Sequence, residues 1–567
     1  MIAVFILILS CLYFYFVGYR FYAGKLDREV ILPNDLRPTP AIENHDGVDY
    51  VASKRMVLFG HNFASIAGAG PIIGPIIAMH HFGWVVTLAW ILIANVFIGS
   101  VHDYFSLMIS VRNRGHSIAD IAEVAMGVRA KVVFSMFLLL AMLLVIAVFG
   151  VVAAKTLISQ PEMVFPTFGI IPVSMVLGWF IYKRNADLTT ATLIAVLAVI
   201  FNIYIGFKLP LPLPEGGLLG LSPLMFWFVI LLLYAGIASV TPVQVLLQPR
   251  DYLSTYILFG SISLGILGLL TVQPDIHTPA FLGFYSDTQG PVWPMLFVLV
   301  ACGAVSGFHS LVAGGTTSKQ LAVESEGRFI GYGGMLAEGI VATVTVLLVG
   351  GGLYWTVPVG EGIDMTVLGF RETLESGGWI LAFGSGFGNI VSQMIPMLSF
   401  TFASMIAVLA LNTFVLTTLD TAARITRFIV QELVGETFPI LSNKYSATVM
   451  VIFMSFLIGA TESWQKIWPI FGATNQLIAA VALFVISSYL IGIKKPAIYT
   501  LIPAVFMVIT TIGALAWQAY GFMTAPTPNI FLGCSAIFLV GLALFVAQEG
   551  FLSLRSLGTR KLQVSQT

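Results

Sequence analysis

Five ionisable residues lie inside stretches that are otherwise apolar, and they are the first candidates for chemistry. They are His61, His102, Asp103, His309 and Glu338. Ionisable groups in apolar spans are costly to bury and are functional candidates by default. Imidazoles and carboxylates suit proton movement or substrate contact. Two alternatives stay open, which are structural hydrogen bonding and a metal site formed by ligands on converging helices. No HExxH or comparable local signature supports a metal.

A run of hydroxyl side chains followed by a lysine is a candidate cation site. It reads Thr316, Thr317, Ser318 and Lys319. Hydroxyl oxygens suit sodium as hard ligands beside unwound carbonyls, whereas a lysine ammonium would fill a cation position itself and couple to protons. The alternative is that the hydroxyls bond back to carbonyls of their own helix and the lysine extends to the membrane surface.

The first element expected to position these groups is a broken helix. Its sequence, GHNFASIAGAGPIIGP at residues 60–75, has glycines and prolines at its centre. Proline removes an amide donor and glycine tolerates unwound backbone, so the helix should be discontinuous. Exposed backbone at membrane depth must line a cavity or be buried in protein. The substrate is therefore expected at Gly68, Ala69, Gly70 and Pro71, with a kink or small-residue packing seam as the alternative.

A second mid-span break is predicted in YAGIASVTPVQVLLQPRDY, residues 234–252. Its candidate substrate contacts are Ser239, Thr241 and Gln244. Further along, Asp420, Arg424 and Arg427 follow helical spacing and indicate a charged helix end with a gating or structural role.

Composition identifies a polytopic membrane protein and excludes a water-soluble enzyme. The 567 residues are 58% hydrophobic and 10% charged, against roughly 25% charged in soluble domains. Equal numbers of acidic and basic residues, without a basic run, exclude an electrostatic footprint for nucleic acid. Three distant cysteines indicate neither a disulfide framework nor a zinc ribbon.

About fifteen apolar stretches are long enough to cross a bilayer, beginning with residues 2–22. With the N-terminus outside, 23 of the 27 Lys and Arg fall on the cytoplasmic side, as short cytoplasmic loops require. The C-terminus is then cytoplasmic. A polar cytoplasmic loop is expected at 23–56 and an external loop, with a possible amphipathic or re-entrant helix, at 356–395.

The spacing of the two predicted breaks indicates an inverted repeat. Two broken helices separated by four intact ones begin two five-helix sets that cross in opposite senses, as in many secondary transporters. The halves are predicted at residues 57–207 and 223–420. One extra helix, 1–22, precedes them, and four more with a cytoplasmic tail occupy 421–567.

These motifs resemble the carbon starvation protein A family of the amino acid, polyamine and organocation superfamily. The similar stretches are DGVDYVASKRMVLFGHNFASIAGAGPIIGP, YAGIASVTPVQVLLQPRDYLSTY, ACGAVSGFHSLVAGGTTSKQLAVESEGRFIGYGGMLAEG, TTLDTAARITRF and IWPIFGATNQLIAAVAL. The resemblance covers residues 46–485 and implies an all-α LeuT-type fold. It also implies a bacterial inner-membrane importer of peptides or pyruvate, made under nutrient limitation. In that fold the ninth span gives hydroxyls to a sodium site, which adds weight to Thr316 and Thr317.

The expected function is secondary active import of carboxylate-bearing nutrients by alternating access, coupled to protons or alternatively to sodium. A substrate carboxylate would meet the amides and positive dipole at a half-helix N-terminus. No cofactor, resident metal or nucleic-acid partner is expected, and the oligomeric state is not predicted. The rival is a membrane nutrient sensor that signals through the loop at 20–56. An intramembrane enzyme is disfavoured because the sequence has no recognised catalytic motif. A passive channel is disfavoured because two broken helices indicate occlusion of the substrate.

Overall fold

The computed structural model describes residues 4–184, 186–355, 369–434, 438–460, 464–526 and 528–557. The described chain is almost entirely helical, with one short antiparallel pair, β1 (Tyr285–Ser286) and β2 (Gly290–Pro291). Within these residues, 13 helices are long and apolar enough to cross a membrane. The prediction of a mostly helical, multi-pass membrane protein is therefore confirmed.

The first half of the chain contains helices and helical turns with these bounds: α1 (Val4–Val17), η1 (Gly18–Ala23), α2 (Gly24–Leu26), η2 (Asp27–Ile31), α3 (Pro40–Glu43), α4 (Arg55–Ala67), α5 (Gly70–Phe82), α6 (Trp84–Ala94), η3 (Asn95–Gly99), α7 (Ser100–Arg112), α8 (Ile118–Met126), α9 (Val128–Ser159), η4 (Pro161–Met163), α10 (Val164–Lys183), α11 (Leu188–Lys208), α12 (Pro223–Val240) and α13 (Leu247–Val272).

The second half continues with α14 (Val292–Leu299), α15 (Ala301–Ala304), α16 (Phe308–Gly315), η5 (Thr317–Lys319), η6 (Glu324–Glu326), η7 (Arg328–Tyr332), α17 (Gly333–Gly352), α18 (Phe370–Met394), α19 (Phe400–Val434), η8 (Pro439–Ser442), α20 (Lys444–Gly459), α21 (Trp464–Gly492), α22 (Ile498–Thr524) and α23 (Ile530–Leu557).

Polar residues at the helix boundaries explain where several spans begin. The side chains of Ser117, Asp187, Ser222 and Asn443 each accept a hydrogen bond from an amide in the first turn of α8, α11, α12 and α20, respectively. These amides lack carbonyl partners within the helix, so a side-chain acceptor stabilises the helix start.

The described residues form thirteen long spans where the sequence predicts fifteen. Residues 293–316 do form helix, but as the short helices α14, α15 and α16. The stretch predicted at 445–460 forms α20, which has 16 residues and is shorter than the other spans. The first span is longer than predicted and continues through two π-helical turns to Ile31, so the polar loop begins there and not at residue 23.

The predicted first break is confirmed. Helix α4 ends at Ala67, α5 begins at Gly70, and Gly68 between them has φ +40° and ψ −158°. This backbone conformation is open essentially to glycine alone, which explains why the interruption falls at that residue.

The predicted second mid-span break is wrong. Helix α12 is continuous through Ser239, and the segment 241–246 joins two separate spans, α12 and α13. Thr241 takes an extended conformation ahead of Pro242, so these residues end a helix. The second interrupted element lies instead at α14–α16, where Val305 is extended between two short helices.

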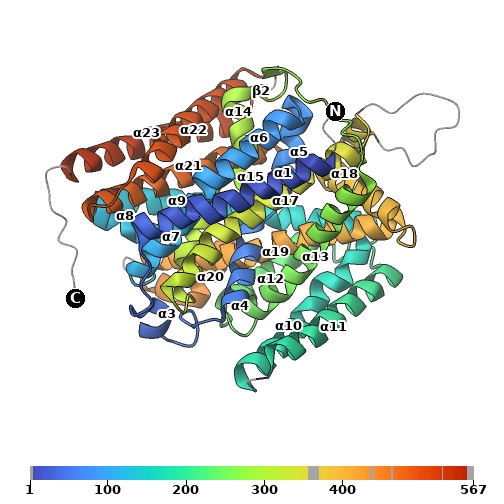
Figure 1. Ribbon diagram of the computed structural model, residues 1–567, viewed down its shortest axis with the longest axis horizontal. Coiled ribbons are helices and arrows are strands. Elements are labelled where there is room, and N and C mark those ends of the chain that lie inside the picture. Colours follow the sequence, from blue (N-terminus) through green and yellow to red (C-terminus); the bar gives the residue numbers. More distant parts are fainter. Residues whose placement is uncertain are drawn as a thin grey trace.

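The helices that carry the candidate residues occupy the centre of the bundle, and others lie at its edges. α5, α15 and α17 are central in Figure 1, whereas α10 and α11 form a pair at one edge and α22 and α23 lie at the opposite side. The part of α21 from Ile470 onward is buried along nearly its whole length, and α11 is largely exposed. The predicted external loop includes α18, which packs on α17 and α19. Its residues 356–368 lie outside the described part.

A short segment lies across one end of the bundle, and we call residues 46–53 the strap. Its Val51 and Ser53 amides donate to the carbonyls of Lys319 and Gln320. Val48 accepts from the amide of Val243, in the connection between α12 and α13. The strap therefore joins elements from both halves of the chain, immediately before α4 begins.

Candidate functional site

The two interrupted elements, α4–α5 and α14–α16, pack closely against each other through glycines. A Cβ at Gly74 would lie 2.5 Å from the carbonyl oxygen of Leu299 in α14, and one at Gly303 would lie 3.3 Å from Cα of Pro71. Gly70 lies against the side chain of Cys302 in α15. Such close backbone packing requires glycine, and it aligns the break in α4–α5 with the break in α14–α16.

Four of the five predicted ionisable residues form one buried group beside the first break. His102 Nδ1 and His309 Nδ1 lie 2.8 and 2.7 Å from the two carboxylate oxygens of Asp103. His309 Nε2 lies 3.2 Å from the carbonyl oxygen of Ile66, one residue before α4 ends. We call His102, Asp103, His309 and Glu338 the central cluster. Its members come from α7, α16 and α17.

Glu338 completes the central cluster without a hydrogen bond. Its Oε2 lies 3.2 Å from His309 Nε2, close enough for an ion pair. Neither carboxyl oxygen of Glu338 has a hydrogen-bond partner among the described residues, although the side chain is fully buried. A buried carboxyl without hydrogen bonds is unfavourable when charged, so this group is well suited to gain and release a proton.

If Asp103 is ionised, the two hydrogen bonds of His309 use two N–H groups. With Asp103 ionised, each imidazole donates its Nδ1–H to that carboxylate. The Ile66 carbonyl can only accept, so His309 must also carry a proton on Nε2 to bond to it. The imidazolium of His309 and the Asp103 carboxylate then cancel, and Glu338 is neutral when it holds its own proton. Loss of a proton from His309 breaks its bond either to Asp103 or to the broken helix.

His61 does not join the central cluster. It lies on α4 and its Nδ1 is 2.7 Å from Asp251 Oδ2 on α13. Asp251 Oδ1 is 3.0 Å from Arg250 Nη2, and Arg250 Nη1 bonds to Asp420 and to the Tyr234 hydroxyl. We call these five residues the His61 network. The sequence analysis did not identify Asp251, although a carboxylate within the QPRDY motif was a possible signal.

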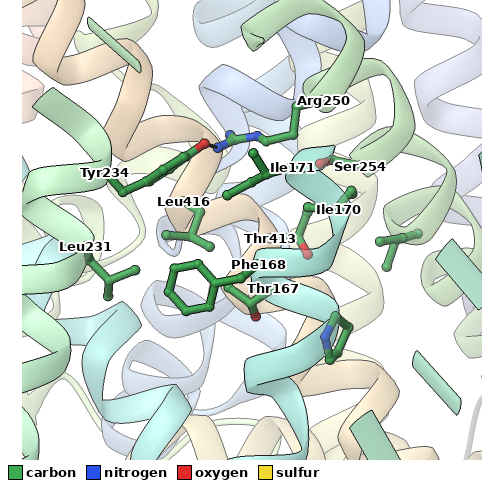
Figure 2. Close-up of a pocket in the computed structure, with 12 residues that line it drawn as sticks. Thr167, Phe168, Ile170, Ile171, Leu231, Tyr234, Arg250, Ser254, Thr413 and Leu416 are labelled. Atoms are coloured by element: carbon green, nitrogen blue, oxygen red, sulfur yellow. Dashed lines mark hydrogen bonds between the residues drawn. The ribbon is translucent and has the colours of Figure 1, made fainter. Parts of the chain in front are cut away.

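A small cavity lies against the His61 network. Figure 2 shows Tyr234 and Arg250 meeting at its edge, with Ser254 and Thr413 on the neighbouring wall. The hydroxyl of Ser254 is buried and has no hydrogen-bond partner in the described part of the chain. The cavity measures ≈ 10 Å³, which is about the space that one buried water needs.

The predicted cation run does not face the break, which corrects that expectation. Thr316 and Ser318 donate to the carbonyls of Val312 and Gly314 in their own chain segment, and Thr317 donates to Asn62 at 2.8 Å. Lys319 Nζ lies 4.2 Å from the ring centroid of Phe428 and near Tyr50. Because α16 ends at Gly315, the run falls on a short turn beyond the helix.

Three threonines of α19 provide the hydroxyls that do meet the break. Thr417 donates to the Ala64 carbonyl at 2.5 Å and Thr418 to the Ser65 carbonyl at 2.9 Å. The Thr421 and Ser65 hydroxyls are 3.0 Å apart. These three threonines were not predicted from the sequence, although they flank Asp420 closely.

The second interruption is fixed by Asn475 of α21, which the sequence analysis also missed. Its Oδ1 accepts from the Phe308 amide at 2.9 Å, and its carbonyl accepts from the Gly307 amide. Its Nδ2 donates to the Ser306 hydroxyl at 3.0 Å. An asparagine in an otherwise apolar span was the available signal. The start of α16 is thus already capped, whereas α5 begins with Gly70 and Pro71.

The predicted substrate contacts from the second segment lie away from the first break. Thr241 Oγ1 donates to its own helix, Gln244 donates to Gly47 of the strap, and Ser239 faces Thr448. The Thr241 carbonyl accepts from Arg424, whereas Gly68 lies against Thr418, six residues earlier on α19. Six residues correspond to about 9 Å of helix, so the two segments contact α19 at separate levels.

No group of three or more His, Cys, Asp and Glu residues in the described ranges has the arrangement of a metal site. The imidazole nitrogens that face carboxylates in the central cluster and in the His61 network are held by those carboxylates. The geometry found is that of hydrogen-bonded imidazole–carboxylate pairs.

The chain matches the family described as Carbon starvation protein CstA over residues 3–367 and 365–514. The pyruvate/proton symporter BtsT of Escherichia coli is 31% identical over 577 residues, which cover 89% of this chain and 80% of that protein. The peptide transporter CstA of Campylobacter jejuni is 31% identical, covering 89% and 79%. The peptide transporter CstA of Bacillus subtilis is 31% identical, covering 88% of both proteins.

Two solved structures also align with the chain. MhsT in complex with L-phenylalanine has a TM-score of 0.49 at 14% identity and covers 88% of this chain and 99% of that one. A manganese transporter of Eremococcus coleocola has a TM-score of 0.48 at 10% identity and covers 91% and 99%.

The curated relatives are named as transporters, which confirms the prediction of a transport protein rather than an enzyme. The family match extends over most of the chain, and the relatives align over nearly nine tenths of it. The chain therefore belongs to the carbon starvation protein CstA family.

Proposed function

We propose that this protein is a secondary active transporter that imports small carboxylate-bearing nutrients, peptides or pyruvate, in symport with protons. The observation that carries the proposal is the buried contact between His309 and the broken helix, with Asp103 and Glu338 alongside. The names of the relatives, pyruvate/proton symporter and peptide transporter, support the same substrate class and coupling ion.

The hydrogen bonds of the central cluster support proton coupling. Protonated His309 bonds to Asp103 and to the Ile66 carbonyl together, and Glu338 holds a further proton without a competing hydrogen bond. Deprotonation changes how the end of α4 is held, so the protonation state and the position of the broken helix depend on each other. A ligand that favours one position must then shift proton occupancy, by reciprocal linkage.

The substrate carboxylate is proposed to bind at the start of α5, at Gly68, Ala69, Gly70 and Pro71. The first amides of a helix lack carbonyl partners and carry the positive end of the helix dipole. Phe149 of α9 lies 3.1 Å from the position of a Cβ on Gly68, which gives the site an apolar wall. Sodium is the less favoured ion, since the Ala64 and Ser65 carbonyls already accept from threonine hydroxyls.

The inverted repeat is proposed with a revised layout. One five-helix set runs from α4–α5 to α13, with α10 and α11 as an inserted pair. The second runs from α14–α16 to α21, with α18 as a connecting helix outside the five. Each set then begins with an interrupted helix, and the two interruptions pack together. Alternating access would follow from rocking of one set against the other.

The proposed location is the bacterial inner membrane, with the N-terminus outside and the C-terminus in the cytoplasm. The excess of Lys and Arg in alternate loops supports this orientation. The strap, the α12–α13 connection and the end of α16 would then share the cytoplasmic side.

Uptake by the purified protein in proteoliposomes tests the function. Labelled pyruvate and a labelled dipeptide are each offered under an imposed pH gradient, a sodium gradient, or neither. We expect one or both substrates to accumulate against their own gradient only when the pH gradient is present. Accumulation driven by sodium alone would overturn proton coupling, and saturable binding without accumulation under any gradient would overturn the transporter assignment in favour of a sensor.

A further inference from the structure

The His61 network is a second buried proton-binding arrangement, separate from the central cluster. Its members come from α4, α12, α13 and α19, and each is at most 3% exposed except Tyr234. His61 Nε2 and Asp420 Oδ1 have no hydrogen-bond partner among the residues described. These two free positions show that the network has unused capacity for protons.

Counted by themselves, the charged groups of this network balance when the network holds one proton. Asp251 and Asp420 contribute two negative charges and Arg250 one positive charge, so the network is negative by one with His61 neutral. Burying an uncompensated charge is strongly unfavourable. His61 is the group placed to hold the balancing proton because its Nδ1 already lies 2.7 Å from Asp251.

Other charged groups on the elements around α4 are engaged elsewhere. Glu338 and His309 lie at the other end of α4, by Ile66. Lys319 of η5 lies over Phe428, and Arg328 of η7 pairs with Asp27. On α19, Arg424 is bound to Asp49 of the strap, which Arg427 also faces. Within the described part of the chain none of these groups contacts His61, whose one charged contact there is Asp251.

His61 lies where its proton can affect how α4 is held. His61 precedes Gly68 by seven residues, or about 10 Å of helix, and it is in the half of the broken helix that leads to the strap. Its bond to Asp251 joins α4 to α13 across elements far apart in sequence. Thr255, one turn beyond Asp251, also donates to the Gly60 carbonyl at 3.1 Å.

We infer that the His61–Asp251 pair is a proton-dependent latch that fastens the α4 half of the broken helix to α13. With the proton bound, the network is neutral and α4 is held. When the proton leaves, the excess negative charge weakens the pair and α4 separates from α13. His61 and Asp251 are positioning residues that act through the helix. The inference deepens the proposed function and rests on it.

Hydrogen–deuterium exchange of residues 55–67 in the purified full-length protein tests the latch, without substrate or gradient. Rates are corrected for intrinsic chemical exchange and compared between about pH 6 and pH 8.5, which brackets histidine titration. We expect exchange in α4 of wild type to be roughly fivefold faster or more at the higher pH. Residues 470–492 of α21 serve as the internal reference.

Two substitutions should fix the latch in opposite states. Asp251→Asn leaves the network neutral without a proton, so α4 should exchange slowly at both pH values. His61→Gln leaves it negative at all pH values, so α4 should exchange rapidly at both. Asp275→Asn, in the exposed connection after α13, is the matched control and should behave as wild type.

Absence of pH dependence in wild type overturns the latch even if both variants misfold. Dependence that survives in His61→Gln assigns the proton elsewhere in the network and also overturns it. The exchange experiment requires no transport. The expected exchange pattern without proton-driven uptake would therefore overturn the proposed function alone, and proton-driven uptake without this pattern would overturn the latch alone.

Discussion

A carboxyl group that is buried without a hydrogen bond makes Glu338 the residue most sensitive to a small chemical change. Glu338→Gln keeps the shape of the side chain and removes its titration. We expect gradient-driven accumulation to fall at least tenfold, because the variant cannot take up and release the proton. Substrate counterflow, which needs no net proton movement, should stay within about twofold of wild type. Uptake and counterflow in the same liposomes separate the two, and unchanged accumulation would rule out the role.

The hydroxyl of Thr418 supports the break by satisfying a carbonyl. Thr418→Val keeps the side-chain volume and leaves the buried Ser65 carbonyl without its donor, at a cost of about 1–3 kcal/mol. We expect a lower thermal unfolding midpoint. Thr271→Val removes a hydroxyl that bonds only to its own helix on an exposed surface, so its midpoint should be unchanged. Equal midpoints for the two variants would contradict the role of Thr418.

Residue types predicted the central cluster better than spacing did. An ionisable residue in an apolar stretch is visible in sequence, so four members of the cluster were identified. Their mutual contacts, and the separate pairing of His61 with Asp251, depend on which helices pack together. Thr417, Thr418 and Asn475 were missed because neutral polar residues are common in spans and become informative only beside a break.

At the scale of the element, the break at Gly68 depends on one backbone conformation. Gly68→Ala places a Cβ in a region open essentially to glycine, at a cost of about 1–3 kcal/mol, and against Phe149 and Thr418. We expect lower thermal stability and loss of uptake. Gly260→Ala on α13 meets no atom within 4 Å and should leave both at or slightly above wild type. A fully active Gly68→Ala would show that the break tolerates regular helix.

The first break was predictable because glycine and proline act on the backbone locally. The second break was misplaced because the prediction relied on such local signals alone. Thr241 and Pro242 do end a helix, but local signals do not distinguish an interruption within a span from a connection between spans. The true interruption around Val305 has no proline and depends on Asn475, a contact from 170 residues further along the chain.

At the scale of the whole molecule, the strap connects both halves of the chain, and Asp49 ties it to α19. Asp49 Oδ1 lies 2.6 Å from Nη1 of the buried Arg424, which also bonds to the Ala238 and Thr241 carbonyls. Asp49→Asn leaves that guanidinium without its carboxylate and should weaken the strap by up to about 3 kcal/mol. We expect faster proteolysis within residues 46–53. Glu43→Gln, on the exposed side of α3, should be cleaved like wild type, and equal cleavage of both variants would contradict this account.

The membrane class follows from composition and length, which are global properties that every span expresses. The arrangement of the spans did not follow, because the pair α10 and α11 shifts every later helix by two positions in a count made along the chain. Figure 1 shows this pair at the periphery, where it adds crossings without adding to the centre.

The close packing of Gly70, Gly74 and Gly303 has a mechanical consequence. Packed helices can slide past one another by small shear movements, but at Gly74 and Gly303 the backbone of α5 meets the backbones of α14 and α15 directly. Direct backbone contact resists sliding, so α5, α14 and α15 are expected to move together as one rigid unit. Their partners α4 and α16 are joined to them only through unwound segments. The pivots of the transport cycle are therefore expected at Gly68 and Val305, and the displacement at the end that carries the strap.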